Sequence, residues 1–322
     1  MKKLLIAISA IAAAVGFTAK ANADISVSGS SNAAYLSTAG NGDDEELAVG
    51  TTVDFSMSTT TSTGLGISAG LSLSTDYDSN NGSVATGGRT ATFTTGGATI
   101  VVGDVEISDT VGSVGGVVNG PLDDASDLSS SVATGFLDDD GMGVELTTAM
   151  GEASLNISFV SNDRVDNHGA LNSSTSGEDS AMSASITMPM GDYSFTIGVA
   201  DSDSGESSSG ASATASIGGG TLTVGYSNQT LIASGNANLA TAGDSEVVGA
   251  TYVMSMDADT TISLGYQSAK DADSESHTQT DLSVERAMGG GATVYLDLRN
   301  LDGDTAANAD GTAIAFGTSV AF

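Results

Sequence analysis

The stretch Leu65-Gly-Ile-Ser-Ala-Gly-Leu-Ser-Leu-Ser74 places an apolar side chain at every odd position, with glycine or serine between them. A period of two residues is typical of a β-strand whose two faces meet different surroundings. The same alternation returns at residues 193–200 and again at 314–322. A disordered acidic chain has no reason to keep this phase, so the pattern predicts an all-β protein.

Sixteen segments of the chain are expected to form strands. They are residues 24–37, 47–59, 65–75, 89–95, 98–102, 141–150, 153–161, 181–188, 193–200, 208–217, 221–227, 246–254, 259–267, 277–287, 292–298 and 312–322. Links after even-numbered strands are short, such as Gly96-Gly97, whereas nearly all links after odd-numbered strands are long and polar, such as 103–140. This alternation indicates an antiparallel barrel with one rim of tight turns and one of long loops.

The N-terminus has the features of an export signal. Lys2 and Lys3 precede the apolar run 4–17, and Ala21-Asn22-Ala23 is a small-x-small cleavage site. We therefore expect a signal peptide at 1–23 and the barrel at 24–322. A retained anchor is the alternative, but the apolar run is short for a spanning helix. No later stretch approaches the roughly 18 apolar residues of such a helix, so membrane crossing would require strands.

Composition restricts the classes of partner. The sequence holds 40 Asp and Glu, 8 Lys and Arg, no cysteine and no tryptophan. Cleavage would remove Lys2, Lys3 and Lys20, which leaves 5 basic residues against the 40 acids. Such a surface excludes nucleic acid, whose phosphates need basic partners. The lack of cysteine excludes disulfides and thiol chemistry.

A membrane barrel explains the modest hydrophobic fraction of 39%. Its outer face meets lipid and needs Leu, Ile, Val, Phe and Tyr, while the inner face meets water and can be small and polar. About sixteen strands leave an aqueous lumen. A soluble β-sandwich or β-helix array is the alternative, but the chain shows no fixed 20–50-residue repeat of the kind that arrays have.

Several stretches together resemble the general porins of alphaproteobacteria, the sixteen-stranded homotrimeric type known from Rhodobacter. They are Asp24-Ile-Ser-Val-Ser-Gly-Ser30, Val53-Asp-Phe-Ser-Met-Ser58, Gly96-Gly-Ala-Thr-Ile-Val-Val-Gly-Asp104 and the terminal Phe322. The chain departs from that family in its basic residues. Such porins usually carry an arginine cluster on the wall opposite the constriction loop, whereas the first five expected strands contain only Arg89.

The resemblance implies a 16-stranded antiparallel transmembrane β-barrel with a long constriction loop after strand 5. It implies an outer-membrane protein, in contact with lipid and lipopolysaccharide, that passes small hydrophilic solutes and ions by diffusion and catalyses nothing. It also implies a homotrimer, and a sorting signal at Phe322 that the assembly machinery reads.

The expected constriction loop, 103–140, is rich in acids. Candidates for the constriction are Asp104, Glu106, Asp109, Asp123, Asp124 and Asp127. Charged loops can also be plain solvated rims, and for most acids of the long loops this alternative is preferred. A ring of carboxylates in a narrow passage concentrates cations and repels anions. We therefore expect a pore that favours cations and neutral solutes.

Four residues are candidates for charged positions on the pore wall: Asp54, Arg89, Asp297 and Arg299. Asp297 and Arg299 share the inward parity of their strand with Tyr295. We expect them to form an ion pair, and we expect Arg89 to pair with acids of the loop.

Calcium is the expected cofactor. Two acidic runs supply hard oxygen ligands, namely Asp43, Asp44, Glu45 and Glu46, and Asp138, Asp139 and Asp140. Neither has the EF-hand spacing. Divalent ions could also link these loops to lipopolysaccharide phosphates.

Two other functions stay open on the sequence alone. A secreted calcium-binding adhesin or surface-layer protein would also tolerate Ser/Thr/Gly strands and acidic loops. An outer-membrane hydrolase would need a serine beside His168 or His277. Both histidines are expected in loops, without a nearby pattern of metal ligands.

Overall fold

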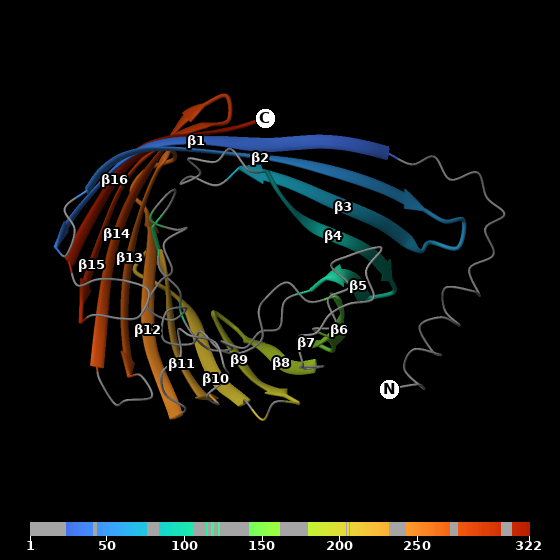
Figure 1. Cartoon of the computed structure of the whole chain (residues 1–322). Coiled ribbons are helices and arrows are strands. Elements are labelled where there is room, and N and C mark those ends of the chain that lie inside the picture. Colours follow the sequence, from blue (N-terminus) through green and yellow to red (C-terminus); the bar gives the residue numbers. More distant parts are fainter. Residues whose placement is uncertain are drawn as a thin grey trace, which may run out of the picture.

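The computed structural model of this chain is a closed barrel of sixteen antiparallel strands in chain order (Figure 1). The structure describes residues 24–40, 44–75, 84–105, 114, 117, 118, 122, 142–161, 180–203, 205, 207–231, 243–270, 276–303 and 311–322. The predicted signal peptide lies outside these residues. Within them, no helix is long and apolar enough to cross a membrane.

The strands of the first half are β1 Asp24–Gly40, β2 Asp44–Thr60, β3 Gly66–Thr75, β4 Val84–Thr95, β5 Ala98–Asp104, β6 Met142–Met150, β7 Ala153–Ser161 and β8 Ser180–Met190. Those of the second half are β9 Tyr193–Ser202, β10 Ser207–Ile217, β11 Gly220–Leu231, β12 Gly243–Ser255, β13 Thr260–Lys270, β14 Ser276–Gly289, β15 Ala292–Asp302 and β16 Gly311–Ala321. The predicted fold and strand number are confirmed.

Several strands are longer than the sequence predicted. β2 begins at Asp44 and β4 at Val84, not at 47 and 89. Both extensions run toward the rim of long links, where polar residues pair in the ladder, as Asp44 does with Thr38. Hydrophobic alternation stops at the edge of the apolar band, but the hydrogen-bonded ladder does not need it, so the pattern underestimates strand length.

The barrel closes where β1 pairs with β16, and Phe322 extends this pairing by one residue. Phe322 and Gly29 exchange two backbone hydrogen bonds, of 3.1 and 3.0 Å, which continue the β1–β16 ladder. The Phe322 ring lies over Gly29, where an added Cβ would come within 2.8 Å of Cζ of the ring. An aromatic ring that covers a glycine on a strand edge helps to fix register. Phe322 therefore contributes to closure; its role as a sorting signal stays a prediction.

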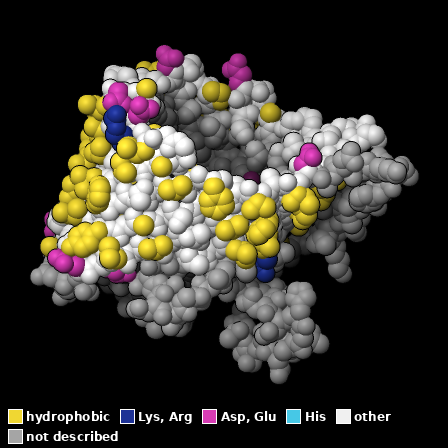
Figure 2. Space-filling model, turned by 90° about the horizontal axis from the view of Figure 1, so that it is seen from above, with side chains coloured by type: hydrophobic (Ala, Val, Ile, Leu, Met, Phe, Trp, Pro, Cys, Tyr) yellow, Lys and Arg dark blue, Asp and Glu magenta, His cyan; other side chains and the backbone are white. Residues whose placement is uncertain are grey.

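The outer face of the barrel carries the apolar side chains. Large hydrophobic residues such as Ile25, Leu47 and Val49 are exposed there, and so are Phe55, Phe195 and Phe316. Figure 2 shows hydrophobic side chains spread over the outer surface, with charged ones toward the edges of the view. In a soluble protein, large apolar side chains are mostly buried. Their exposure on the outer face is expected of a barrel whose outer surface contacts lipid.

The wall of the barrel is uneven in height. β1 and β2 have 17 residues each, whereas β5 has 7 and β6 and β7 have 9. A tilted strand needs about 9–11 residues to cross the hydrocarbon layer. The wall is therefore lowest at β5, where the long link between β5 and β6 begins.

Candidate functional site

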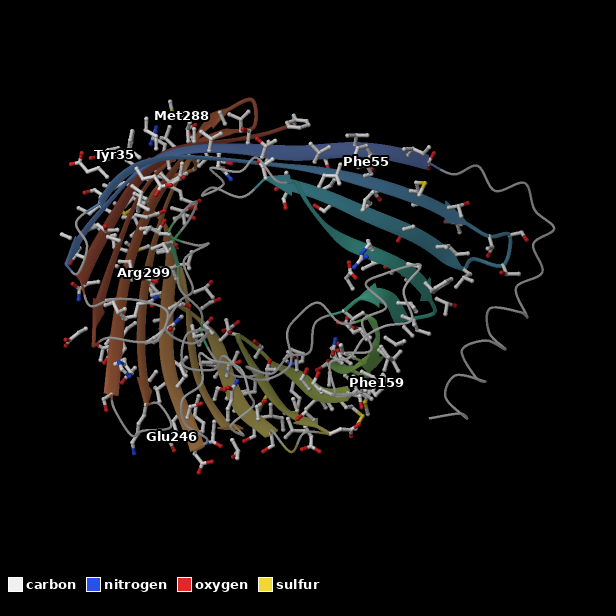
Figure 3. All side chains as sticks on the ribbon, in the orientation of Figure 1. Tyr35, Phe55, Phe159, Glu246, Met288 and Arg299 are labelled. Atoms are coloured by element: carbon white, nitrogen blue, oxygen red, sulfur yellow. The ribbon has the colours of Figure 1, made fainter. Side chains whose placement is uncertain are left out.

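The inner face of β12–β16 is polar and yet buried. On β14, for example, His277, Gln279, Asp281 and Ser283 are each no more than 3% exposed. The residues between them point outward, and Figure 3 shows the same division, with Tyr35, Phe55 and Glu246 outside the ring and Arg299 inside. We call the inner face of β12–β16 the covered wall. Some part of the chain must exclude water from it.

Part of that cover comes from the link between β5 and β6, residues 105–141. Five of its residues are described: Val105, Val114, Val117, Val118 and Leu122. All but Val117 are at most 5% exposed. They lie against the inner face of the barrel, as the following contacts show.

Val105 packs against the inner side of β7, β8 and β9. Its cluster contains Val160, Ala181 and Ala200. Further along the link, Val118 and Leu122 pack with three other residues from β1, β15 and β16, which are Ala34, Tyr295 and Ala315. The described residues of the link thus contact the inner wall at two widely separated places.

Small residues make room for this segment. An ideal Cβ on Gly249 of β12 would lie 2.9 Å from Cβ of Val114. One on Gly265 of β13 would lie 3.2 Å from Cγ2 of Val117. Glycine at these inward positions lets the backbone of the link approach the sheet closely.

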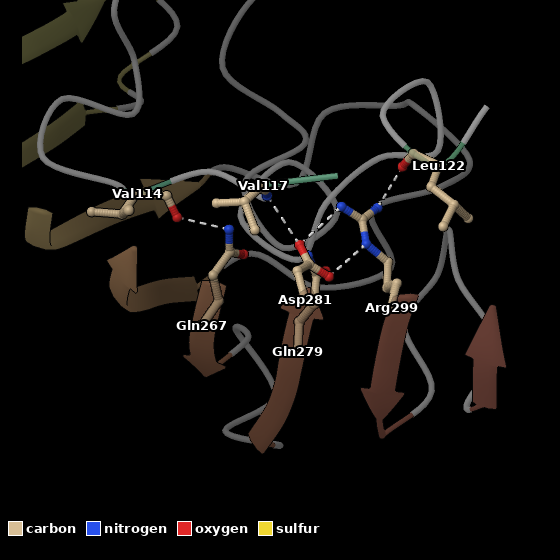
Figure 4. Close-up of polar contacts among 7 residues, drawn as sticks. All are labelled: Val114, Val117, Leu122, Gln267, Gln279, Asp281 and Arg299. Atoms are coloured by element: carbon tan, nitrogen blue, oxygen red, sulfur yellow. Dashed lines mark hydrogen bonds and ion pairs between the residues drawn. The ribbon is translucent and has the colours of Figure 1, made fainter. Parts of the chain in front are cut away.

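Three hydrogen bonds join the segment 114–122 to the covered wall (Figure 4). The Gln267 side-chain amide donates to the carbonyl of Val114 at 2.7 Å. The backbone N–H of Val117 donates to Oδ2 of Asp281 at 3.3 Å. Arg299 donates through Nη1 to the carbonyl of Leu122 at 2.9 Å.

Beneath the segment, Arg299 forms an ion pair with Asp281. Nε of Arg299 lies 3.1 Å from Oδ1 and Nη2 lies 3.3 Å from Oδ2, with side-chain exposures of 8% for Arg299 and 1% for Asp281. Gln279 also donates to Oδ2 at 2.9 Å. The two-point geometry suits a guanidinium and a carboxylate. The charge of Arg299 is neutralised out of reach of water.

Asp281 is a partner of Arg299 that the sequence did not predict, while the pairing of Asp297 with Arg299 stays a prediction. Both of these side chains do face inward, at 0% and 7% exposure, as parity predicts. Residues two apart on one strand share a face but not a cross-strand position, whereas Asp281 of β14 lies directly opposite Arg299. An irregularity at Ala287/Gly289 shifts the register of this hairpin and aligns the two charges. The sequence contains no clear signal of that shift.

A different situation holds on the inner face of β2–β6, which we call the open wall. Asp54 lies there, exposed, and accepts a hydrogen bond of 2.7 Å from Ser72 directly opposite. Glu46 shares its face on β2 and is exposed, and Glu145 of β6 faces inward beside Thr147. The prediction missed Glu145, although its alternation with Val144 and Leu146 already gives an inward parity.

Arg89 and Asp104 form an ion pair, but not on the lumen side. Nε of Arg89 lies 3.2 Å from Oδ2 of Asp104, and the Arg89 side chain is 59% exposed. Asp104 lies opposite Met142, on the face of β6 that carries Val144, while its neighbours Gly103 and Val105 are buried inward. The register thus places the pair on the outward side. The expected pairing of Arg89 with an acid of the loop 103–140 is confirmed by this contact. The outward register does not favour the predicted wall role of Arg89 or the constriction role of Asp104, and both roles stay predictions.

The other predicted constriction acids, Glu106, Asp109, Asp123, Asp124 and Asp127, lie outside the described residues. So do Asp43, His168 and the run 138–140. His277 is described and is not in a loop: it belongs to β14 and is 3% exposed. The predicted strand 277–287 already began at this residue, so the expectation that His277 lies in a loop was wrong at the boundary of that strand.

The first predicted calcium cluster lies partly outside the described residues. Glu45 and Glu46 are consecutive residues of β2, so their side chains point to opposite faces of the sheet. Calcium binding at this cluster stays a prediction. Among the described residues, no three acids or histidines lie close enough to hold a metal ion.

Comparisons with known proteins agree with this geometry. A profile of the family described as Gram-negative porin matches residues 5–306. No curated protein matches the sequence significantly. Many solved structures share the fold, among them the following three porins. A porin refined at 1.8 Å is 18% identical, with a TM-score of 0.68 over 93% of this chain and 100% of its own.

An anion-selective porin from Comamonas acidovorans is 13% identical, with a TM-score of 0.68 over 94% of this chain and 100% of its own. A variant of the Rh. blastica porin is 14% identical, with a TM-score of 0.61 over 93% of this chain and 100% of its own. At these identities the likeness concerns the fold alone.

Proposed function

The chain belongs to the Gram-negative porin family, and on that premise we propose that its channel favours cations and neutral solutes over anions. The family and the fold make it an outer-membrane channel for passive diffusion of small solutes. They also indicate a channel rather than an enzyme, and they favour a channel over a secreted adhesin. The sign of its selectivity has to come from its own residues.

The fold itself does not set that sign, because the Comamonas porin that shares it is anion-selective. The observation that carries the proposal is the distribution of charge on the inner face. Among the described residues, Arg299 is the only Lys or Arg whose side chain faces inward. Its charge is neutralised by Asp281 beneath the link 105–141. The open wall carries Glu46, Asp54 and Glu145 with no described basic residue on the same face.

Carboxylates on the wall of a narrow channel act on passing ions more strongly than on an open surface. The low-dielectric walls focus the field and raise the local concentration of cations. The predicted loop acids, Glu106, Asp109, Asp123, Asp124 and Asp127, would add to the same potential if the link 105–141 narrows the bore. The chain as a whole carries 40 acids against 8 basic residues.

The experiment is a reversal-potential measurement on purified protein in planar bilayers with a tenfold KCl gradient. We expect a reversal potential close to the potassium equilibrium potential. The uptake of neutral sugars should depend little on the charges of the lumen acids. A reversal potential of zero, or one on the chloride side, would contradict the proposal.

We further propose that the protein is a homotrimer and that the β4–β5 wall lies at a subunit contact. β5 has too few residues to cover the hydrocarbon layer, and the register places the Arg89–Asp104 ion pair on its outward side. Charged groups facing lipid are costly, so another protein surface suits this place better. If cross-linking through an introduced Arg89→Cys gave no dimer, this placement would be wrong.

Two narrower proposals remain, the first of them at residues outside the described part of the chain. One is calcium binding at Asp138, Asp139 and Asp140, with bridging to lipopolysaccharide phosphates. The other is membership of the alphaproteobacterial branch of porins. For calcium, unchanged thermal stability and oligomer retention in EDTA would end the proposal.

A further inference from the structure

We propose that Asp281 and Arg299 are positioning residues that hold the segment 114–122 against the covered wall and thereby fix the bore of the channel. We call them the docking pair. The inference deepens the proposed function, on which it rests for the existence of a channel, but it does not depend on the sign of the selectivity.

The docking pair is placed where it cannot act on passing ions. Its side chains are 8% and 1% exposed, and its two charges cancel. Buried ion pairs seldom stabilise a protein more than apolar residues of the same volume would. A role other than plain stability or ion selection therefore has to explain the pair.

The hydrogen bonds of the pair point to that role. Asp281 accepts from the N–H of Val117, and Arg299 donates to the carbonyl of Leu122. Each member of the pair thus holds one end of the segment 117–122, and the type of bond is matched. The carboxylate takes the backbone donor and the guanidinium takes the backbone acceptor.

The wall does not need the pair for its own cohesion. β14 and β15 are joined by a ladder that runs from Thr278–Asp302 to Gly289–Ala292. The described residues of 114–122, which are Val114, Val117, Val118 and Leu122, meet the wall through side-chain hydrogen bonds and packing instead. The segment's described contacts with the wall are the pair, the amide of Gln267, the apolar cluster around Leu122 and the close approach at Gly249 and Gly265.

The chain contains no cysteine, so an engineered disulfide can report the position of the segment. Val114→Cys with Gly249→Cys is suited to this, because an ideal Cβ at 249 lies 2.9 Å from that of Val114. A disulfide needs about 3.5–4.5 Å between Cβ atoms. The change Gly249→Cys itself displaces the segment by about 1 Å to that distance, so every variant is compared with the same double-cysteine background, and further displacement slows cross-linking. The rate of cross-linking with copper phenanthroline then measures how well the segment stays docked.

Three changes are made in this background. Arg299→Gln removes the charge and its bonds. Val117→Pro removes the backbone donor and leaves the pair intact on the wall; Val117→Ala keeps the backbone donor and is its matched control. The double change Asp281→Arg with Arg299→Asp exchanges the two charges, so the ion pair between β14 and β15 is kept. A guanidinium then faces the N–H of Val117 and a carboxylate faces the carbonyl of Leu122, so neither hydrogen bond to the segment can form.

We expect Arg299→Gln, Val117→Pro and the reversed pair each to slow cross-linking by about tenfold, since losing a hydrogen bond to a charged group costs about 1.5–3 kcal/mol, and 1.4 kcal/mol is tenfold. Open-channel current noise should rise in parallel. Heat-modifiable gel mobility shows whether the barrel is folded in each variant.

If the variant with the reversed pair cross-linked at the wild-type rate and showed no added current noise, the proposal would be overturned. The pair would then serve only to hold β14 and β15 together. A wild-type cross-linking rate in Val117→Pro would also overturn the proposal. This test remains valid even if the charge variants fail to fold. A wild type without cation preference, but with these cross-linking results, would refute the proposed selectivity and leave the docking pair in place.

Discussion

The covered and open walls are made by the same alternation of residues, yet their acids have different surroundings. On the covered wall, Asp281 is 1% exposed and is bonded to Arg299, Gln279 and the backbone of Val117. On the open wall, Asp54 is exposed and bonded to Ser72 alone among the contacts described. Inward parity therefore does not decide what an acid does. The cover over it decides whether it holds the structure or meets ions.

The largest expected effect comes from breaking the covered wall. Asp281→Ala leaves the Arg299 guanidinium buried without its carboxylate, and removing one partner of a buried pair costs about 3–5 kcal/mol. We expect a loss of that size in the free energy of unfolding, measured by urea titration in lipid vesicles. Asp54→Ala on the open wall is the matched control, with a change of about 0.5 kcal/mol or less. Equal losses would erase the contrast between the walls.

A second change crowds the covered wall without touching its charges. Gly249→Ala places a Cβ 2.9 Å from Val114, so the segment must move. Overpacking of this kind costs about 1–3 kcal/mol. We expect lower stability and an altered single-channel conductance. Gly66→Ala, on the open side with no neighbour nearer than 3.7 Å, should leave both unchanged. If Gly249→Ala changed neither the stability nor the single-channel conductance, the segment would not lie against β12.

A third change acts on the open wall. Asp54→Asn removes one lumen charge, and a unit charge about 10 Å away in water is worth about 0.4 kcal/mol, or roughly twofold. Because the charge acts on K⁺ and Cl⁻ in opposite directions, the K⁺/Cl⁻ permeability ratio should fall by up to about fourfold in dilute KCl and less at high salt. Glu246→Gln removes a charge on the outer face (Figure 3) and should not change the ratio. Equal shifts in both variants would point to net charge rather than position.

The smallest effect is expected outside both walls, in the turn between β12 and β13. The pKa of Asp257 is lowered, chiefly by a hydrogen bond from the backbone N–H of Asp259 and then by one from the Thr260 hydroxyl. A lowered pKa in the folded state gives stability that is present above the ordinary value near 3.8 and lost as the pH falls through the folded value. Asp257→Asn should therefore cost slightly more thermal stability at pH 7 than at pH 3. A larger cost at pH 3 would contradict this.

The sequence predicted the barrel because period-two alternation and the short and long links are local features. It predicted the inward faces of Asp297 and Arg299 for the same reason. The partner of Arg299 could not be predicted, because it depends on a register shift near Met288 that brings Asp281 opposite. Arg89 and Asp104 were assigned to the pore by family resemblance, although the parity of Arg89 with Phe93 already indicated the outer face. The cover over β12–β16 was implied by resemblance, but its contacts follow from tertiary packing alone.

One paired measurement tests the division between the walls most directly. Reversal potentials in a tenfold KCl gradient are compared for Asp54→Asn with Glu145→Gln, and for Asp281→Asn with Arg299→Gln. The account predicts that the open-wall variant moves toward zero while the covered-wall variant keeps the wild-type reversal potential, even if its conductance changes. A shift in the covered-wall variant with none in the open-wall variant would contradict the account.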